Sequence, residues 1–559
     1  MSDAYVQLGE RLPPRASQAS GSVPIDAKGV AAWVDALPRA NQQATLQQLI
    51  AAFQVWRGAV MLGPQRASVM EAVRPVALES IALIERALQS ATFPLTPQRA
   101  QMAETCQTLH RELALGYRMA LHEFLAPTGN VPFLRGGAAA GLAVRSAWHY
   151  SRLLMLSYFL YRVPPEDCWF GLHSVYRFAH YAGLLSKQIQ EAAEGAPRTV
   201  AQLYQQAILL ALSNPYRFSQ REQGELWGLT RELGALLQLA ERQGAQDSFM
   251  IPVDTDRGPG YTPEERESGN TLGFWFCVQP LRDVLDAPLA QAGVEAVSVR
   301  LPQSRLPLQA PADLLRRLRA GWATAAERRS RRLGATHSLD TVLGLIGLHF
   351  FLSGGTDFDT FTREIRGYSS QAVAERASWA NASTDSVRAS RAKATVLDQS
   401  LGGYRLQWPR EAGLRIRVGE LIGLSIAHEE DDPLWMVGVV RWIRYSADGS
   451  VDAGVELLAR RARAVSLRTL DPLGNPKSPQ RGILIDWLRE RNDQDAVFVV
   501  APSQIDLQAH RLEVSTPTEE DAIDPQTSSM QHYHNMSAIE QAGDYVLLRV
   551  RHARTEVSS

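Results

Sequence analysis

Cysteines and long apolar runs are both scarce in this chain of 559 residues. The three cysteines, Cys106, Cys168 and Cys277, are far apart and odd in number, which argues against a disulfide framework and for a reducing compartment. No uncharged apolar run reaches the roughly 20 residues of a membrane-spanning helix. The N-terminus also lacks the basic and then apolar layout of a signal peptide. These absences predict a soluble cytoplasmic protein without a transmembrane segment.

The chain also lacks an excess of charge of either sign and any recognised catalytic motif. Its formal net charge is −1, so no long-range field attracts nucleic acid or acidic membranes, and anion recognition must come from a local cluster. We find no phosphate-binding loop, nucleophile elbow, zinc-protease motif or dinucleotide fingerprint. His532 and His534 have no third metal ligand nearby, and the acidic run 429–432 is typical of a solvated turn. We therefore expect no enzyme, no cofactor, no metal and no nucleic-acid partner.

Length and composition predict several folded domains. The chain is longer than one hydrophobic core usually supports, and its 45% apolar and 21% charged residues lie in the ordinary globular range. Residues 1–27, rich in Pro, Ser and Gly, predict a flexible leader. A helical period over 28–243 predicts an α-helical bundle, with helix starts at Thr96–Pro97 and at Ser219–Glu222. Aromatic residues crowd 148–182, where we expect them to fill a core rather than line a pocket.

The second half of the chain changes to a strand-like pattern. Residues 244–324 predict a linker and a mixed α/β connecting segment that leads into an amphipathic, arginine-rich helix. Six apolar or β-branched runs between about 340 and 465 predict a small antiparallel barrel, with a long insertion at 353–392 that reads as a loop with a short helix. These runs are TVLGLIGLHFFL, KATVL, YRLQW, RIRVGELIGLSI, LWMVGVVRWIRY and AGVELLARR.

Residues 478–559 predict a small C-terminal β-rich unit. Its expected strands are AVFVV, HRLEV and DYVLLRVRH, with a short helix at ILIDWLRER and a mobile polar stretch near 516–533. The predicted fold class is therefore multidomain α+β, with a helical bundle followed by a barrel and a further β-rich unit.

The densest basic cluster of the chain is RRSRR at 328–332. The guanidinium groups of Arg328, Arg329 and Arg332 suit a guanine nucleotide, because a planar fork bonds in pairs to phosphate oxygens or to the guanine edge and stacks on the base. A solvated helix end, where cations complement the helix dipole, is the alternative.

A second feature is the turn in VLDQSLGGYRL, residues 396–406. Asp398 and Ser400 can bond backbone or ligand groups, while Gly402 and Gly403 permit positive φ and a close approach of a ligand to the backbone. Taken alone, this segment is an ordinary hairpin turn.

Together and in this order, the two features resemble the PilZ family of cyclic di-GMP receptors. That family has RxxxR on a segment leading into a six-stranded barrel, followed by [D/N]xSxxG at a strand turn. Arg328 and Arg332 match the first motif, and Asp398, Ser400 and Gly403 match the second. The runs VGVVRWIR and AGVELL also resemble the family's later strands. The separation of the two motifs exceeds the family's usual distance, and the 353–392 insertion accounts for the excess.

The resemblance implies a PilZ-like six-stranded antiparallel β-barrel over 325–470 that binds cyclic di-GMP. The arginines would contact a guanine and the phosphates, and the turn would hold the other guanine. The implied site consists of Arg328, Arg329, Arg332, Asp398, Ser400, Gly402 and Gly403. Ordering of the arginine segment would then rearrange the domains and alter binding of a protein partner by the helical domain. Motility, polysaccharide export and biofilm formation are typical outputs of the family.

Two other interpretations stay open. The chain is either such a receptor or an interaction scaffold whose barrel binds no ligand and whose helical domain binds a protein. Nucleic-acid binding by the arginine cluster is a third interpretation, which the near-neutral net charge disfavours. The sequence does not distinguish one bound cyclic di-GMP from a stacked pair.

Overall fold

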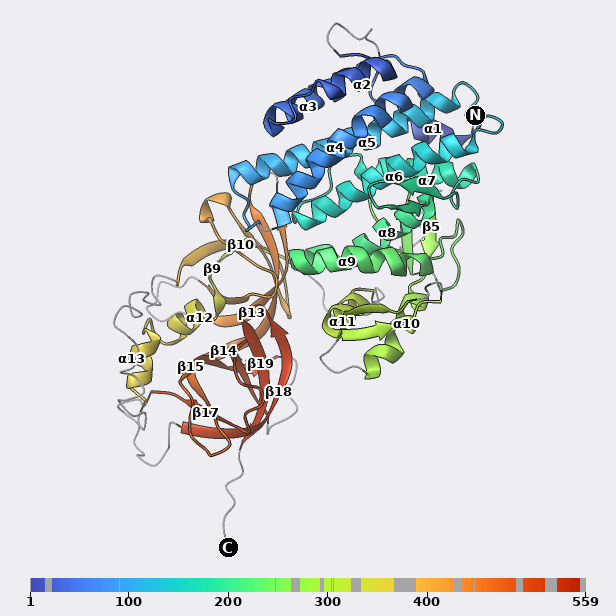
Figure 1. Ribbon diagram of the computed structural model, residues 1–559. Helices are drawn as coiled ribbons and strands as arrows, with labels where there is room; N and C mark the ends of the chain where they lie inside the picture. Colours follow the sequence, from blue (N-terminus) through green and yellow to red (C-terminus); the bar gives the residue numbers. More distant parts are fainter. Residues whose placement is uncertain are drawn as a thin grey trace. The chain divides into compact units, whose positions relative to one another are not determined.

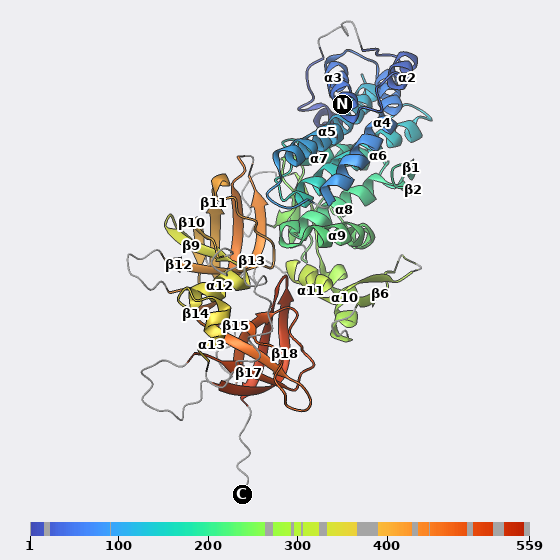
Figure 2. The same ribbon diagram turned by 60° about the vertical axis from the view of Figure 1, so that its left-hand side comes forward.

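A computed structural model divides the chain into two compact units, Met1–Arg329 and Ser330–Ser559, and each is described by itself (Figures 1 and 2). Among the described helices, none combines the length and the apolar character that crossing a membrane requires. The residues described are 2–15, 23–89, 91–246, 248–262, 272–291, 296–302, 304, 306–322, 333–365, 389–426, 434–446, 448–488, 496–517 and 530–552.

The first unit is mainly helical, as the 3.6-residue period predicts (Figure 1). The expected helix starts are present: Thr96 caps α5 through the Arg99 amide, and Ser219 and Glu222 form a capping box at α9. The helices are α1 (Asp3–Gly9), α2 (Ala27–Asp35), α3 (Gln42–Gly58), α4 (Gly63–Gln89), α5 (Pro97–Leu125), α6 (Gly136–Phe159), α7 (Cys168–Tyr181), α8 (Val200–Leu212) and α9 (Gln220–Leu233), with short strands β1 (Ile189–Glu191) and β2 (Ala196–Arg198) between α7 and α8.

The N-terminal helix differs from the predicted flexible leader. Tyr5 and Leu8 of α1 are buried in the same core as the later helices, so part of segment 1–27 is ordered by packing rather than by any local period. The aromatic cluster at 148–182 belongs largely to the same core, with Phe170 and Phe178 almost fully buried. The expectation that these rings fill a core therefore describes most of them.

The connecting segment 244–324 packs on the helices of the first unit. Leu281, Leu315 and Trp322 are buried in the core that the helices form. Its elements are β3 (Phe249–Pro252), β4 (Gly260–Tyr261), β5 (Gly273–Phe276), α10 (Gln279–Gln291), β6 (Ala296–Val299), β7 (Leu308–Pro311) and α11 (Ala312–Gly321).

The second unit begins with a closed six-stranded antiparallel barrel, as predicted. Its strands pair in the ring β9–β10–β11–β14–β13–β12 and back to β9, and β8 (Leu333–Gly334) pairs with the end of β10. The strands are β9 (Ser338–Leu343), β10 (Arg391–Ser400), β11 (Gly403–Trp408), β12 (Leu421–Ile426), β13 (Met436–Tyr445) and β14 (Val451–Leu470).

The C-terminal strands form a second closed barrel that shares β14 with the first (Figure 1). The ring is β14–β15–β16–β19–β18–β17 and back to β14. Residues 451–459 of β14 pair with strands of the first barrel, and residues 459–470 pair with strands of the second. The added strands are β15 (Gln480–Trp487), β16 (Ala496–Pro502), β17 (Arg511–Ser515), β18 (Met530–Ala542) and β19 (Tyr545–His552).

Three local predictions for the second unit were wrong. The run 344–352 is the helix α12 (Gly344–Leu352) rather than a strand: a continuous apolar run fits either element, and Gly344 ends β9 at a φ of +78°. The run ILIDWLRER contributes to β15 rather than to a helix, because β14 and β16 pair with it. His532 and His534 lie in β18 rather than in a mobile stretch.

The 353–392 insertion contains the expected short helix, α13 (Phe358–Arg363). Residues 366–388, most of the insertion, lie outside the described part of the chain. The insertion is therefore described only at its two ends.

Candidate functional site

The segment that directly follows the arginine cluster pairs with the strand that leads into the predicted turn, at one end of the first barrel. Arg328, Arg329 and Arg332 lie outside the described residues, but β8 begins at Leu333, directly after them. Leu333 pairs with Gln399 and Gly334 pairs with Asp398 on β10. The first described residues after the arginine cluster therefore lie opposite Asp398 and Gln399, next to the predicted turn.

The turn between β10 and β11 is built as a tight reversal. Ser400 and Gly403 face each other across it, and Ser400 Oγ donates a hydrogen bond to the Gly403 carbonyl oxygen at 3.4 Å. A Cβ atom on Gly403 would lie 2.0 Å from the Val455 carbonyl oxygen on β14, so only glycine fits there. Gly402 is exposed, with open space around its Cα, and it does not adopt positive φ. The close approach and a φ of +158° thus both explain the glycine at 403, as the sequence predicts.

Asp398 is placed beside a β-bulge. The pairing of β10 with β11 shifts between Val396 and Asp398, which inserts Leu397 as an extra residue on β10. Such a bulge redirects the next side chain. The Asp398 side chain is 21% exposed, and its Oδ2 lies 3.9 Å from Arg405 Nη1. The carboxylate is therefore accessible at the barrel end and already close to a cation.

A charged network next to Asp398 was missed by the sequence reasoning. Arg405 Nη2 and Arg444 Nη2 both donate to Oδ2 of the buried Asp452, at 2.7 and 3.1 Å. Gln407 Nε2 donates to Asp452 Oδ1 at 2.9 Å. The two arginine side chains are 32% and 34% exposed. They thus hold β11, β13 and β14 together, and Arg405 also connects the network to Asp398.

The pairing of three strands brings this network together: Arg405 lies on β11, Arg444 on β13 and Asp452 on β14. The only local signal was a pair of arginines inside apolar strand-like runs, YRLQW and VVRWIR. A charged residue at such a position predicts a partner on a neighbouring strand, but it does not say which partner.

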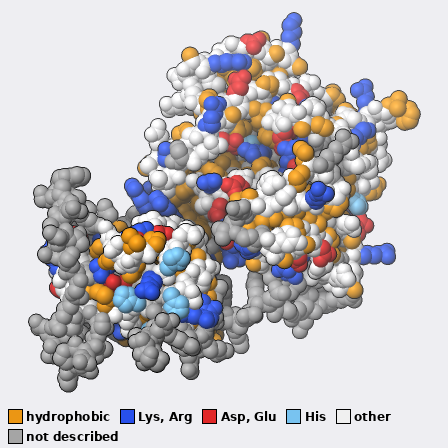
Figure 3. Space-filling model, turned by 60° about the horizontal axis from the view of Figure 1, so that its bottom comes forward, with side chains coloured by type: hydrophobic (Ala, Val, Ile, Leu, Met, Phe, Trp, Pro, Cys, Tyr) orange, Lys and Arg blue, Asp and Glu red, His pale blue; other side chains and the backbone are white. Residues whose placement is uncertain are grey.

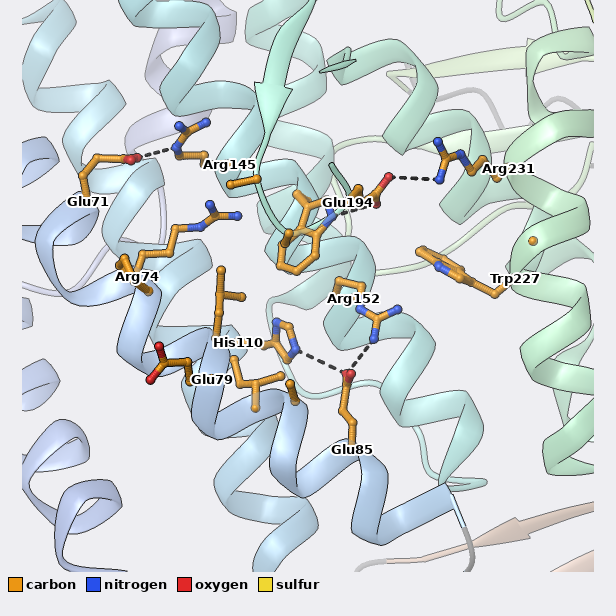
Figure 4. A pocket seen from close by; sticks show the side chains of 18 residues that line it. Glu71, Arg74, Glu79, Glu85, His110, Arg145, Arg152, Glu194, Trp227 and Arg231 are labelled. Carbon is orange, nitrogen blue, oxygen red and sulfur yellow. Dashed lines mark hydrogen bonds and ion pairs between the residues drawn. The ribbon is translucent and has the colours of Figure 1, made fainter. Parts of the chain in front are cut away.

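A separate pocket of about 760 Å³ opens in the helical unit between α4, α5, α6 and α9 (Figure 4). Its arginines face carboxylates: Arg145 pairs with Glu71, Arg152 with Glu85 at 2.6 Å, and Arg231 with Glu194 at 3.4 Å (Figure 4). The sequence reasoning did not find this pocket, since its charged residues come from distant helices. Because these charges are paired, the pocket has no evident preference for an anion.

Donor atoms of Glu85, Cys106 and His110, beside this pocket, lie within 4.8 Å of one another. Burial raises the pKa of the Cys106 thiol and lowers the pKa of His110, which favours the neutral form of both groups. Burial alone would raise the pKa of Glu85, but the interactions of its carboxylate with His110, whose Nε2 lies 3.8 Å away, and with the charge of Arg152 outweigh burial and lower the pKa to about 2. Since Arg152 already pairs with that carboxylate, we assign the group to a structural charge network rather than to a metal.

Comparisons with known proteins agree with this architecture. The family model described as "Cyclic-di-GMP receptor FimW, N-terminal domain" matches residues 28–257. The model described as "Cyclic-di-GMP receptor FimW, middle PilZ domain" matches residues 248–394 and 366–464, which include the first barrel. The cyclic-di-GMP receptor FimW of Pseudomonas aeruginosa is 25% identical over 519 residues, covering 84% of this chain and 83% of the relative.

No solved structure matches the chain significantly. The matched segments of the two family models together run from residue 28 to residue 464, and they end within β14. The resemblance drawn from Arg328, Arg332, Asp398, Ser400 and Gly403 is thus supported by matches over a far larger part of the chain, and the chain belongs to the PilZ-containing family of cyclic di-GMP receptors.

Proposed function

We propose that this chain is a cyclic di-GMP receptor whose ligand binds at the end of the first barrel where β8, β10 and β11 meet. The pairing of β8 with β10 carries the proposal, because it brings the segment that follows the arginine cluster beside Asp398. The proposed ligand-binding residues are Arg328, Arg329, Arg332, Asp398, Ser400, Gly402 and Gly403.

Each part of this site has a chemical role toward a guanine dinucleotide. The arginines bond to phosphate oxygens and to a guanine edge through planar, bidentate contacts. The Asp398 carboxylate accepts hydrogen bonds from guanine N–H groups, and the open space at Gly402 admits the ligand to the backbone. Charge-assisted bonds contribute about 1.5–3 kcal/mol each, which offsets the roughly 1–2 kcal/mol per residue needed to order a short segment.

The receptor acts, in this proposal, without catalysis and through a change in its connecting segment. The division between the two units falls between Arg329 and Ser330, inside the arginine cluster. Ligand contacts to the cluster therefore restrict the segment that links the barrels to the helical unit, which alters the binding of a protein partner by the helices. We place the receptor in the cytoplasm, in keeping with its free cysteines.

Isothermal titration of the full chain with cyclic di-GMP tests the site. Arg332→Ala and Asp398→Ala should each weaken binding at least tenfold, the equivalent of one charge-assisted bond. Arg410→Ala removes an exposed cation at the opposite end of β11 and should leave the affinity unchanged. Unchanged affinity in the first two variants refutes the site, and absence of any binding by the folded chain favours the scaffold interpretation.

A nucleic-acid role has less support. On the face seen in Figure 3, basic side chains are interspersed with acidic and neutral ones rather than gathered into one continuous patch. Binding of the full chain to arbitrary DNA with a steep salt dependence would nevertheless favour that role over ours.

A further inference from the structure

The second barrel repeats the strand order of the first. Numbered along the chain within each barrel, the strands form the ring 1-2-3-6-5-4 in both cases. The proposed site of the first barrel lies where strand 1 begins, strand 2 ends and strand 3 begins. In the second barrel these are the middle of β14, the end of β15 and the start of β16.

A pocket of about 650 Å³ lies at that place in the second barrel. This volume falls within the roughly 300–1,000 Å³ of ordinary ligand pockets. Its lining combines two cations, one carboxylate and two aromatic rings, contributed by Arg460, Arg461, Asp486, Trp487 and Phe498.

A β-bulge turns both arginines toward this pocket. Ala459 pairs with Trp487 and Ala462 pairs with Ile485, so Arg460 and Arg461 together oppose the single residue Asp486. Adjacent side chains of a regular strand point to opposite faces, and the extra residue of a bulge relaxes that alternation. The bulge therefore explains how two successive arginines line one pocket.

The polar groups of the pocket are available to a ligand. Arg460, Arg461 and Asp486 are exposed, and none of them forms an ion pair with another residue of the described ranges. The indole Nε1 of Trp487 is buried without an acceptor in the same ranges. The rings of Trp487 and Phe498 lie 5.1 Å apart at 53°, which gives the pocket an aromatic wall.

We propose that this pocket is a second nucleotide site, which takes a guanine base linked to phosphate. The two guanidinium groups bond to phosphate oxygens, and Asp486 accepts from the paired N1–H and N2–H donors that guanine has and adenine lacks. The base stacks on the Trp487 ring. Because every base can stack in this way, the selectivity for guanine comes from Asp486 rather than from the ring. The site has none of the residues of the first one, so it does not depend on that proposal.

The second site is not a copy of the first in its turn chemistry. The first barrel has Ser400 and Gly403 in a tight reversal directly after Asp398, whereas Trp487 and Leu488 follow Asp486. Recognition in the second barrel thus relies on the aromatic wall and the bulged arginines.

A two-by-two set of full-chain variants separates the sites by isothermal titration with cyclic di-GMP and, in a second arm, with GMP. The first-site pair is Arg332→Ala with Asp398→Ala, and the second-site pair is Arg460→Ala with Arg461→Ala. In the variant that carries both first-site substitutions, we expect at least one of the two probes still to bind. Adding both second-site substitutions to this variant should weaken that remaining binding at least tenfold. Binding of GMP as well as cyclic di-GMP identifies a mononucleotide site, and binding of cyclic di-GMP alone a dinucleotide site.

Control variants keep the test decisive. Arg463→Ala removes a nearby exposed cation of β14 that does not line the pocket, so it should leave this binding intact. Asp486→Asn keeps the shape of the side chain and should weaken guanine nucleotides selectively, so that AMP serves as the comparison. Three outcomes overturn the proposal. Neither probe binds the first-site variant; Arg463→Ala weakens binding as much as the second-site pair does; or AMP binds with the same affinity as GMP. Failure of the first-site pair to change binding contradicts only the first site.

Discussion

The two barrels of this protein share a strand and a strand order, yet they present different chemistry at the same position. In the first, a tight turn held by Gly403 supports Asp398 next to the network of Arg405 and Asp452. In the second, a bulge in β14 places two arginines opposite one carboxylate beside an aromatic wall. The comparison teaches that the strand order determines where a binding site can form at the end of a barrel. Local backbone irregularities, such as the turn and the bulge, determine which side chains line that site.

The barrels are also joined by contacts besides β14. Arg441 on β13 pairs with Glu540 on β18, with 2.8 Å between Nη2 and Oε2, and its Nε donates to Glu456 Oε2 at 2.7 Å. The Tyr545 hydroxyl on β19 donates to Glu540 Oε1 at 2.7 Å. These side chains are about a quarter exposed or less, so they are only partly screened by solvent. We therefore expect a substitution that destabilises one barrel to destabilise the other as well.

The largest expected effect comes from filling the close approach in the first barrel. Gly403→Val would place its Cβ against the Val455 carbonyl and separate β11 from β14, and we expect more than about 4 kcal/mol of destabilisation. Thermal unfolding followed by circular dichroism measures it. Gly402→Ala is the matched control, because nothing lies near its Cβ, and it should change stability by less than about 0.5 kcal/mol. Equal effects of the two variants would show that the turn is not packed as described.

An intermediate effect is expected from breaking the ion pair between the barrels. Arg441→Ala leaves Glu456 and Glu540 close together without their cation, so we expect a loss of about 2 kcal/mol. Denaturant unfolding of Arg441→Ala, Glu540→Gln and the double variant gives the coupling energy directly. A coupling energy near zero would mean that the shared strand alone joins the barrels.

A smaller effect, dependent on pH, is expected at Glu420. Burial, together with the charge of Asp544 in the turn between β18 and β19, raises the pKa of Glu420 to about 7. The folded state thus holds this proton more tightly than the unfolded chain does, so the contribution to stability is complete below about pH 4.5 and is lost as the pH rises to about 7.

Glu420→Gln should therefore remove about 1–3 kcal/mol of the decrease in unfolding free energy between pH 4.5 and 8. Denaturant unfolding of both proteins across this range measures the difference. Glu411→Gln, at an exposed position of the same barrel, should leave the slope unchanged. A wild-type slope in Glu420→Gln would contradict the assignment.

Short sequence motifs predicted part of the site and of the fold, whereas contacts between residues far apart in the sequence were not predicted. The residues of the arginine cluster and of the Asp398 turn, and the order of these two motifs along the chain, identified the first barrel, because each motif is short and can be recognised without the fold. Arg405 and Asp452 were missed because a charged residue in a strand does not reveal its cross-strand partner. The helix α12 was mistaken for a strand since its residues are continuously apolar, and packing of Leu345 and Leu348 in the barrel core is what distinguishes the two.

The sequence by itself determined the helix starts at Thr96 and Ser219, the helical first half, and the order of the two motifs on a strand-rich second half. The helix starts, the helical period and each motif by itself depend on residues a few positions apart, so the sequence alone reveals them. Only the tertiary structure decided that β14 serves two barrels and that Arg460 and Arg461 face Asp486. The physical reason is that strand register joins residues far apart in the chain, and a single bulge changes which side chains share a face.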